Sequence, residues 1–224
     1  MSIKDRICKH KEIIITKIQI KSYIIKINVD DNEPVSRESV FTEGPFALHV
    51  CSDTEITVKA EEDSEILVQC TKNDAKFDSK LYRPEDAPWG YSCVGKFGNV
   101  AKRRVNTIID KEIAPYSNMV LGEVFNQPGR WSSYPPHHHP QPEVYYYRFD
   151  KPQGFGACFN ADEVYKSVDS SACFIHDGED HQQVVAPGYN MYYVWMIRHL
   201  DGDPWLQTTR NEDEKYVWLH DAEF

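Results

Sequence analysis

The stretch His137-His138-His139, followed by Glu143, holds the side chains best able to bind a metal ion. In a strand, residues two apart face the same side, so His137 and His139 would project together and His138 away from them. Their imidazoles would then lie about 6–7 Å apart along the strand, close enough to converge on one ion. The spacing therefore predicts a metal site that uses His137 and His139.

Glu143 can join this site only if the chain turns. On a straight strand its carboxylate would lie roughly 20 Å from His137. The segment Pro140-Gln141-Pro142 favours a turn, because proline fixes φ and cannot donate to a sheet ladder. A new strand that begins at Glu143 would bring the carboxylate back beside the histidines.

A fourth ligand is expected from a distant strand, and His181 is the candidate. It follows the polar segment Asp177-Gly178-Glu179-Asp180 and precedes an apolar run. Three imidazoles and one carboxylate suit a divalent ion such as Zn, Mn, Fe, Co or Ni, and the spacing does not choose among them. The competing interpretation is a solvated, histidine-rich loop without a metal.

The elements that must position these residues are predicted to be short strands. Apolar and polar residues alternate in many short runs, whereas a sustained helical period is almost absent, which predicts an all-β sandwich or barrel. The polar segment 76–100, punctuated by proline and glycine, predicts a junction between two β-rich halves. The clearest predicted strands are 45–52, 55–61, 64–71, 118–126, 143–149, 171–176, 183–186 and 190–198, with two or three more within 12–29.

The composition disfavours several classes of partner. A formal net charge of −10 over 224 residues makes the protein a poor partner for nucleic acid or for an anionic membrane surface. The six cysteines form no CxxC pair, which is typical of a reducing compartment. The sequence shows neither a leader-peptide pattern nor a run of about 18 apolar residues, so we expect a cytoplasmic protein without a membrane span.

The metal-binding pattern also carries a resemblance to a known family. H-x-H-x3-E followed by a distant histidine resembles the metal signature of the cupin superfamily. The stretches "WSSYPPHHH", "EVYYYRFDKPQGFG" and "VVAPGYNMYYV" closely resemble the 5-deoxy-glucuronate isomerase family of bacterial inositol catabolism. This resemblance covers about residues 37–218 and implies a bicupin fold of two jelly-roll barrels. We expect residues 1–90 to form a metal-free half and residues 91–224 to form the metal-binding barrel.

The resemblance also implies an activity. The family reaction is an aldose–ketose isomerisation that converts a sugar acid, 5-deoxy-glucuronate, to 2-deoxy-5-keto-gluconate. His137, His139, Glu143 and His181 match the family's metal ligands. Because the reaction requires no redox change of the metal, zinc is the expected ion among the divalent metals.

Four further residues are candidates for catalysis or substrate binding. Tyr145 and Tyr147 share the inward parity of Glu143, so each is a candidate for proton transfer, although packing in the core is as good an explanation. Arg148 and Gln153 are candidates for substrate binding. Arg148 has the opposite parity and would need a β-bulge to face the site, and Gln153 lies in the loop after the strand.

Departures from the family pattern keep other functions open. Residues 157–159 and 177–180 replace polar, basic or aromatic residues of the family, which favours a sugar-binding cupin without catalysis as one alternative. A metal-dependent oxygenase with the same ligands is another. Open sheet edges also favour a homo-oligomer.

Overall fold

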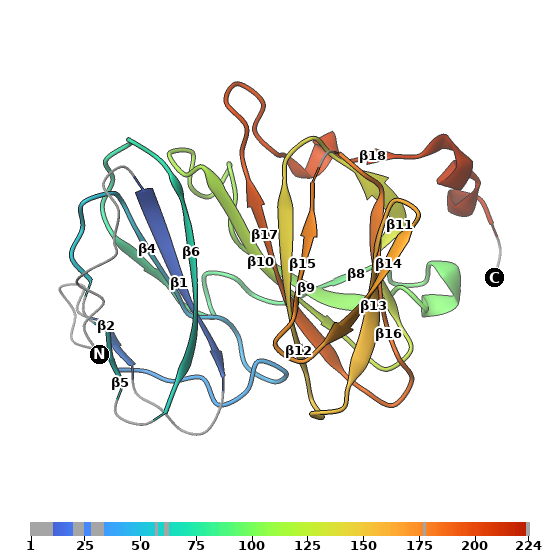
Figure 1. The fold of residues 1–224 in the computed structure, drawn as a ribbon, viewed down its shortest axis with the longest axis horizontal. Coiled ribbons are helices and arrows are strands. Elements are labelled where there is room, and N and C mark those ends of the chain that lie inside the picture. The colour runs from blue at the N-terminus through green and yellow to red at the C-terminus, as the bar shows by residue number, and fades with distance from the viewer. Residues whose placement is uncertain are drawn as a thin grey trace. The chain divides into compact units, whose positions relative to one another are not determined.

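The computed structural model describes residues 11–19, 25–27, 34–56, 58–60, 63–176 and 178–222. The first ten residues and Asp177 lie outside the described residues, as do residues 20–24 and 28–29 of the predicted strand region 12–29. Apart from three short 3-10 helices, every regular element of the described chain is a strand (Figure 1). The predicted all-β class is therefore confirmed. No helix in the described part of the chain is long and apolar enough to span a membrane.

The chain forms two compact units that interleave in sequence. The first unit comprises Met1–Pro88 and Glu112–Asn118, and the second comprises Trp89–Lys111 and Met119–Phe224. The chain therefore enters the second unit, returns to the first for a short segment, and then enters the second again. No pattern in the sequence predicts the return at residues 112–118.

The first unit contains two antiparallel sheets. Side chains from both, including Ile13, Leu48 and Val58, form one hydrophobic core. The four-stranded sheet has the order β6-β1-β4-β7, and the three-stranded sheet has the order β3-β2-β5. These strands are β1 (Lys11–Gln19), β2 (Ile25–Ile27), β3 (Pro34–Val35), β4 (Ala47–Val50), β5 (Val58–Ala60), β6 (Glu65–Lys72) and β7 (Lys80–Tyr82).

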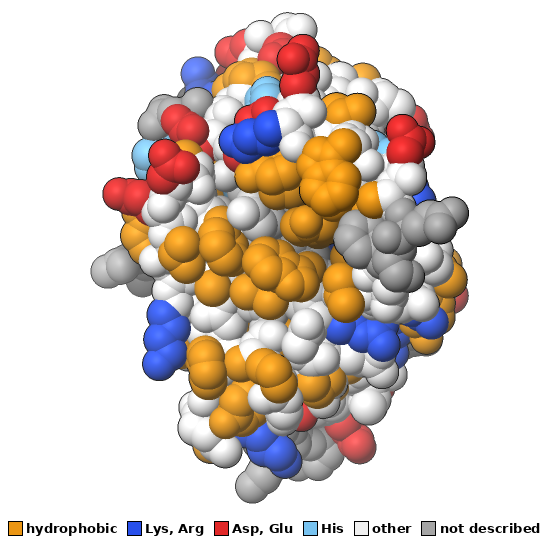
Figure 2. Space-filling view, turned by 90° about the vertical axis from the view of Figure 1, so that its right-hand side faces the viewer, with side chains coloured by type: hydrophobic (Ala, Val, Ile, Leu, Met, Phe, Trp, Pro, Cys, Tyr) orange, Lys and Arg blue, Asp and Glu red, His pale blue; other side chains and the backbone are white. Residues whose placement is uncertain are grey.

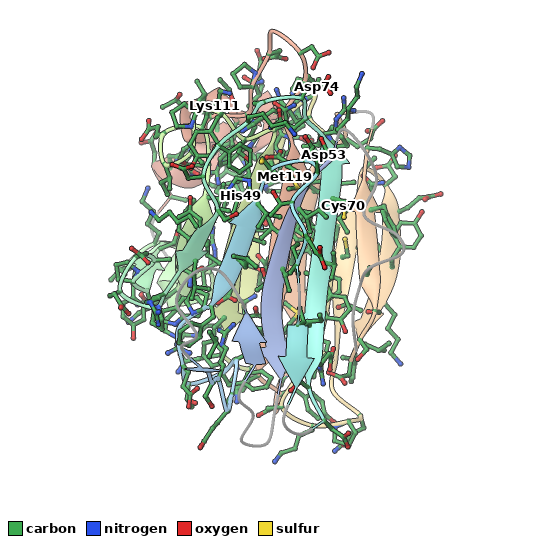
Figure 3. All side chains as sticks on the ribbon, turned by 90° about the vertical axis from the view of Figure 1, so that its left-hand side faces the viewer. His49, Asp53, Cys70, Asp74, Lys111 and Met119 are labelled. Atoms are coloured by element: carbon green, nitrogen blue, oxygen red, sulfur yellow. The ribbon has the colours of Figure 1, made fainter. Side chains whose placement is uncertain are left out.

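A buried polar network holds the returning segment in the first unit. Glu12 and His49 are both fully buried, and Glu12 Oε2 lies 3.0 Å from His49 Nε2. The backbone N–H of Asn118 donates to Glu12 Oε1 at 2.6 Å. Figure 3 labels His49 on β4. Because a buried carboxylate is costly without such partners, the network fixes residues 117–118 against β1.

The second unit contains the two sheets that carry the predicted site. The six-stranded sheet has the order β15-β12-β17-β10-β9-β8, and the five-stranded sheet has the order β14-β13-β16-β11-β18. Every neighbouring pair is antiparallel. The strands are β8 (Gly90–Ser92), β9 (Arg103–Ile109), β10 (Met119–Asn126), β11 (Trp131–His138), β12 (Glu143–Phe149), β13 (Phe155–Asn160), β14 (Glu163–Val168), β15 (Ala172–Ile175), β16 (His181–Val185), β17 (Met191–Arg198) and β18 (Asn211–Glu212).

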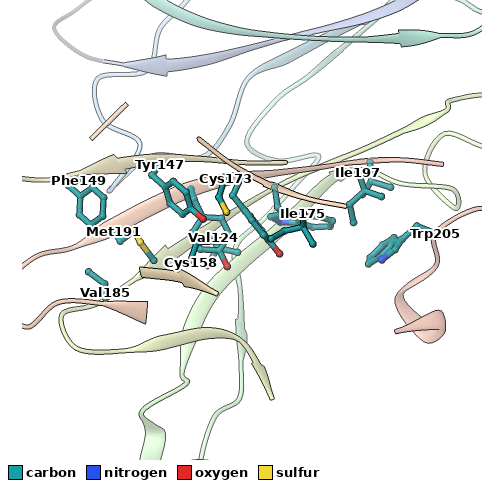
Figure 4. Close-up of a cluster of buried hydrophobic side chains, with 14 residues drawn as sticks. Val124, Tyr147, Phe149, Cys158, Cys173, Ile175, Val185, Met191, Ile197 and Trp205 are labelled. Atoms are coloured by element: carbon teal, nitrogen blue, oxygen red, sulfur yellow. The ribbon is translucent and has the colours of Figure 1, made fainter. Parts of the chain in front are cut away.

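The core of the second unit lies between these sheets. Tyr147 and Met191 come from the six-stranded sheet, and Cys158 and Val185 come from the five-stranded sheet (Figure 4). All four side chains belong to one buried cluster. The two sheets therefore pack face to face and form a sandwich whose interior is filled by side chains.

The contact between β13 and β16 sets a first prediction. A Cβ on Gly156 would lie 2.3 Å from the backbone oxygen of Val184 and 2.9 Å from Ser167 Oγ. Gly156→Ala must therefore push β16, which begins at His181, away from β13. We expect it to lower the free energy of unfolding by about 2 kcal/mol, measured by urea denaturation.

Gly90→Ala is the matched control. Gly90 also lies in a strand of the second unit, but a Cβ there would meet its nearest atom at an ordinary 3.7 Å. Equal stability of the two variants would contradict the close packing of β13 on β16.

Candidate metal centre

The predicted turn brings the ligand candidates of two sheets together. β11 ends at His138 in the five-stranded sheet, and β12 begins at Glu143 in the six-stranded sheet. The four residues between them carry the chain across from one sheet to the other. His181 begins β16 and lies opposite His137 in the ladder between β11 and β16. Three strand ends thus meet at one place between the sheets.

The side chains of His139, Glu143 and His181 converge. Glu143 Oε2 lies 3.2 Å from Nε2 of His139 and 3.2 Å from Nε2 of His181. Among the described residues, these three form a group whose potential ligand atoms all lie within 4.8 Å of one another. The ring of His137 lies beside them, with its centroid 4.6 Å from that of His181. All four side chains are buried.

Backbone carbonyls fix the orientation of all three imidazole rings. Nδ1 of His137, His139 and His181 lies 3.1, 2.9 and 3.0 Å from the carbonyl oxygens of residues 135, 141 and 179, respectively. A carbonyl oxygen only accepts, so each Nδ1 donates its proton. In the neutral rings the lone pair is then on Nε2, which is the atom that faces the cluster. This is how metal-binding histidines are commonly oriented by their second hydrogen bond.

The electrostatics of the cluster favour a cation. Burial alone would raise the pKa of Glu143, but contacts from His139 and His181 outweigh it and hold this pKa at about 2. Burial and the neighbouring His181 lower the pKa of His137 well below its usual value. The cluster thus presents a carboxylate and a neutral imidazole to the same space.

One buried atom in the cluster lacks a hydrogen-bond partner. Nε2 of His181 is buried and lies 3.2 Å from Glu143 Oε2, but this contact does not have the geometry of a hydrogen bond. An unsatisfied buried polar atom costs free energy, and a metal ion bound by that atom would remove the cost. Three imidazole nitrogens and one carboxylate also form a ligand set that zinc and similar divalent ions accept. The residues present therefore fit a divalent metal.

His138 faces away from the cluster, as its parity predicts. Its Nδ1 lies 2.9 Å from Asp180 Oδ1, and its side chain is 38% exposed. The histidine triplet is thus split by the strand period into two inward rings and one outward ring. Its outward position makes His138 a suitable control for the two inward histidines.

The two candidate tyrosines occupy different places. Tyr145 lines the same cavity as His137, His139 and Glu143, and its hydroxyl lies 3.3 Å from Ser133 Oγ. Tyr147 is not part of this lining, and its hydroxyl donates to Gln183 Oε1 at 2.6 Å within the buried core. Both side chains face the interior of the sandwich, but they lie at different positions along β12. Only Tyr145 is in reach of the cavity.

Neither Arg148 nor Gln153 lines the cavity, so substrate binding there is not supported for either residue. β12 pairs with β17 from Glu143 to Phe149 without a register shift, so no bulge turns Arg148 inward. Its Nε instead donates to Asp169 Oδ1 at 2.8 Å. Gln153 is exposed in the turn between β12 and β13.

The cavity has polar residues that the sequence analysis missed. It encloses about 120 Å³ beside the histidine cluster. Arg103 from β9 and Arg210 from the segment before β18 line it, together with Ser133 and the aromatic side chains of Tyr193 and Trp205. Apolar and polar residues alternate poorly in the segment "RRVNTII" of β9, so it was not predicted as a strand. The hydrophobic pattern therefore did not identify Arg103 as a site residue.

Two antiparallel sheets thus form a sandwich with three histidines and one glutamate at a shared end, and this cluster fits a divalent metal. The family model of the KduI/IolB family matches residues 8–219, and the chain belongs to this family. The family resemblance of the sequence is thereby confirmed.

Relatives and solved structures agree with this assignment. The chain is 29% identical to a 5-deoxy-glucuronate isomerase of Bacillus licheniformis over 214 residues, which cover 87% of this chain and 76% of the relative. It is also 29% identical to the enzyme of that name from Bacillus subtilis subsp. natto, over 75% of this chain and 68% of the relative.

Among solved structures, an IolB-like protein from Salmonella typhimurium superposes with a TM-score of 0.82 at 20% identity, over 95% of this chain and 83% of that one. The oxalate decarboxylase of Lactobacillus farciminis superposes with a TM-score of 0.62 at 10% identity, over 96% and 76% of the two chains. At these identities the two structures support the fold alone.

The ligand geometry gives a second prediction. The double variant His137→Ala and His139→Ala removes two of the nitrogens that face the cluster, so we expect it to lose its metal while it keeps its fold. Elemental analysis after desalting measures the metal, and circular dichroism measures the fold.

His138→Ala serves as the control and should retain the metal of the unchanged protein. Full metal occupancy in the folded double variant would overturn the ligand assignment.

Proposed function

We propose that this protein is an aldose–ketose isomerase that converts 5-deoxy-glucuronate to 2-deoxy-5-keto-gluconate in inositol catabolism. The observation that carries the proposal is the family match over residues 8–219 in a chain whose buried histidine and glutamate cluster is intact. Relatives named 5-deoxy-glucuronate isomerase, which align with most of the chain, support the substrate.

We propose that the activity depends on a divalent metal held by His137, His139, Glu143 and His181. Such an ion would polarise the substrate carbonyl and stabilise the negative charge that develops on its oxygen. Zinc is sufficient because the isomerisation has no net redox change, and Mn, Fe, Co or Ni would also accept these ligands. The backbone contacts at Nδ1 of each histidine keep the ligand atoms aimed at one point.

Tyr145 would hold a proton in the cavity. Burial is the main cause that raises the pKa of Tyr145 well above its usual value, and the charge of Glu143 raises it further. The phenol therefore stays protonated, so its role would be to donate a hydrogen bond or a proton from Oη to a substrate oxygen. It would not serve as the base that removes the carbon-bound proton.

Apolar side chains would keep water away from the reacting groups. Trp195, Ile197 and Trp205 line the cavity, and the ring of Trp205 lies 6.3 Å from that of His139, measured between centroids. A wall of this kind lowers the local dielectric and strengthens each charge–dipole interaction with the substrate.

The substitutions that favoured a non-catalytic sugar-binding protein lie away from the cavity. Residues 157–159 belong to β13, and neither they nor residues 178–180 are part of the cavity lining. Asp177 lies outside the described residues. The altered segments therefore give no reason to prefer the non-catalytic alternative, and no observation favours an oxygenase.

The location and assembly of the protein stay predictions. We propose a cytoplasmic enzyme, and no disulfide joins the described cysteines. Apolar side chains gather on the face shown in Figure 2. Independently of that view, Tyr91 and Trp218 are large apolar residues with exposed fractions of 66% and 61%. Such exposure favours the predicted homo-oligomer, which light scattering would measure.

The proposed activity is tested with purified, zinc-loaded protein and 5-deoxy-glucuronate. We expect proton NMR to show the aldehyde signal fall as the signals of 2-deoxy-5-keto-gluconate appear, because the cluster would stabilise the enediolate between the two isomers. Chelation of the metal should stop the conversion, and added zinc should restore it. A folded, metal-loaded sample that leaves the sugar unchanged would refute the proposed substrate.

The two tyrosines provide a further test. Tyr145→Phe removes the phenol that would face the substrate, so we expect kcat to fall about 100-fold with stability nearly unchanged. Tyr147→Phe removes a hydrogen bond inside the core, so we expect kcat to stay within about threefold. Its free energy of unfolding should instead fall by about 1–2 kcal/mol, because Gln183 loses its partner. The reverse pattern in steady-state kinetics and urea denaturation would exclude the role of Tyr145.

A further inference from the structure

We infer that Arg103 and Arg210 form a carboxylate-binding pair in the cavity and restrict the enzyme to aldoses that carry an acid group. This inference rests on the proposed isomerase function and assigns the acid end of its substrate. It concerns a part of the cavity lining that is distinct from the metal cluster and from Tyr145.

Arg103 is built into the wall of the cavity. Its side chain is only 7% exposed and shares the inward face of β9 with Val105, which also lines the cavity. One nitrogen, Nη1, donates to the backbone oxygen of Ala101 at 3.0 Å and to Cys93 Sγ at 3.3 Å. These contacts fix one edge of the guanidinium. They satisfy little of its hydrogen-bonding capacity, because a guanidinium has five N–H donors.

Arg210 brings a second positive charge to the same lining. It is half-buried, and burial together with the charge of Arg103 lowers its pKa. The charge of Glu212 raises the pKa of Arg210, but the Glu212 carboxylate is already in contact with Nε2 of His220. Within the described ranges, no ion pair joins a carboxylate to Arg103 or Arg210. Two like charges thus line one cavity.

The charge balance of the cavity indicates what it accepts. The chain has 35 acidic and 25 basic residues, yet the only acidic side chain among the lining residues is Glu143, which faces the histidines. Enclosing two cations without a counter-charge is unfavourable, and a bound carboxylate would remove this cost. Arginine is also suited to carboxylates, because its planar donors match two carboxylate oxygens.

A sugar acid would satisfy both parts of the cavity. An open-chain hexuronate has an aldehyde at one end and a carboxylate at the other. The aldehyde and its neighbouring hydroxyl would face the histidine and glutamate cluster, and the carboxylate would face the arginines. Selection for the acid would then come from the arginines and not from the metal.

The test compares two substrates that differ only at the acid end. 5-Deoxy-glucuronate carries a carboxylate, and 5-deoxy-glucose carries an uncharged hydroxymethyl group. We expect Arg210→Met and Arg103→Met each to lower kcat/KM for the acid by about 100-fold, while kcat/KM for the neutral sugar changes less than about threefold. Arg198→Met is the matched control, because Arg198 is exposed at the end of β17, and it should change neither value.

A binding measurement separates this inference from the proposed reaction. Isothermal titration would compare gluconate with glucitol, its uncharged counterpart, on zinc-loaded protein. We expect the unchanged protein to prefer gluconate and both arginine variants to lose this preference. Arginine-dependent binding without turnover of 5-deoxy-glucuronate would refute the proposed reaction and keep the acid site.

The opposite result would refute the inference alone. If the unchanged protein isomerises 5-deoxy-glucuronate and the folded arginine variants keep its preference for the acid, the carboxylate is held elsewhere. Arg210 is half-buried, so we expect Arg210→Met to fold. This variant therefore provides the test if Arg103→Met does not fold.

Discussion

The candidate site of the second unit depends on one constraint: three imidazole rings and a carboxylate are held in the same buried space. Glu143 Oε2 lies 3.2 Å from Nε2 of both His139 and His181. Electron-rich ligand atoms repel one another at such distances unless a proton or a metal ion lies between them. The hydrogen bonds of the three histidines to backbone carbonyls prevent the rings from turning away. The fold thus maintains an arrangement that a divalent cation stabilises.

The two-sheet architecture brings these four side chains together. His137 and His181 are neighbours in one sheet, and Glu143 begins a strand of the other. A four-residue crossing that contains Pro140 and Pro142 joins the two sheets at this point. The same crossing places Tyr145 two residues beyond the carboxylate, on the inward face. The position of the phenol is therefore set by the strand that supplies a ligand.

Local patterns predicted the parts of the site that depend on parity. The alternation in the histidine triplet separated His137 and His139 from His138, and the prolines indicated the turn before Glu143. The same patterns could not predict how far along its strand a side chain lies from the cavity, or which residues pair between strands. Tyr145 and Tyr147 share a parity, and only the packing of the sheets places one at the cavity and the other against Gln183. Arg148 has outward parity, and a regular ladder with β17 keeps it there.

Residues whose role depends on distant segments gave no signal in the sequence. Arg103 lies on a strand that opens with two arginines, so its hydrophobic pattern is weak. Arg210 reaches the cavity from a segment with little regular structure. No sequence pattern indicated that His49 would be buried, although it is fully buried against Glu12 in the first unit. In each case the long-range fold, and not the neighbouring residues, decides what the side chain contacts.

The central claim is that these four side chains bind one divalent ion, and X-ray absorption spectroscopy of the zinc-loaded protein tests it most directly. Binding by these four side chains predicts a shell of nitrogen and oxygen atoms at about 2.0–2.2 Å, with the multiple-scattering signature of three imidazoles and without sulfur. A shell that contains sulfur at about 2.3 Å, or fewer than two imidazoles, would contradict it.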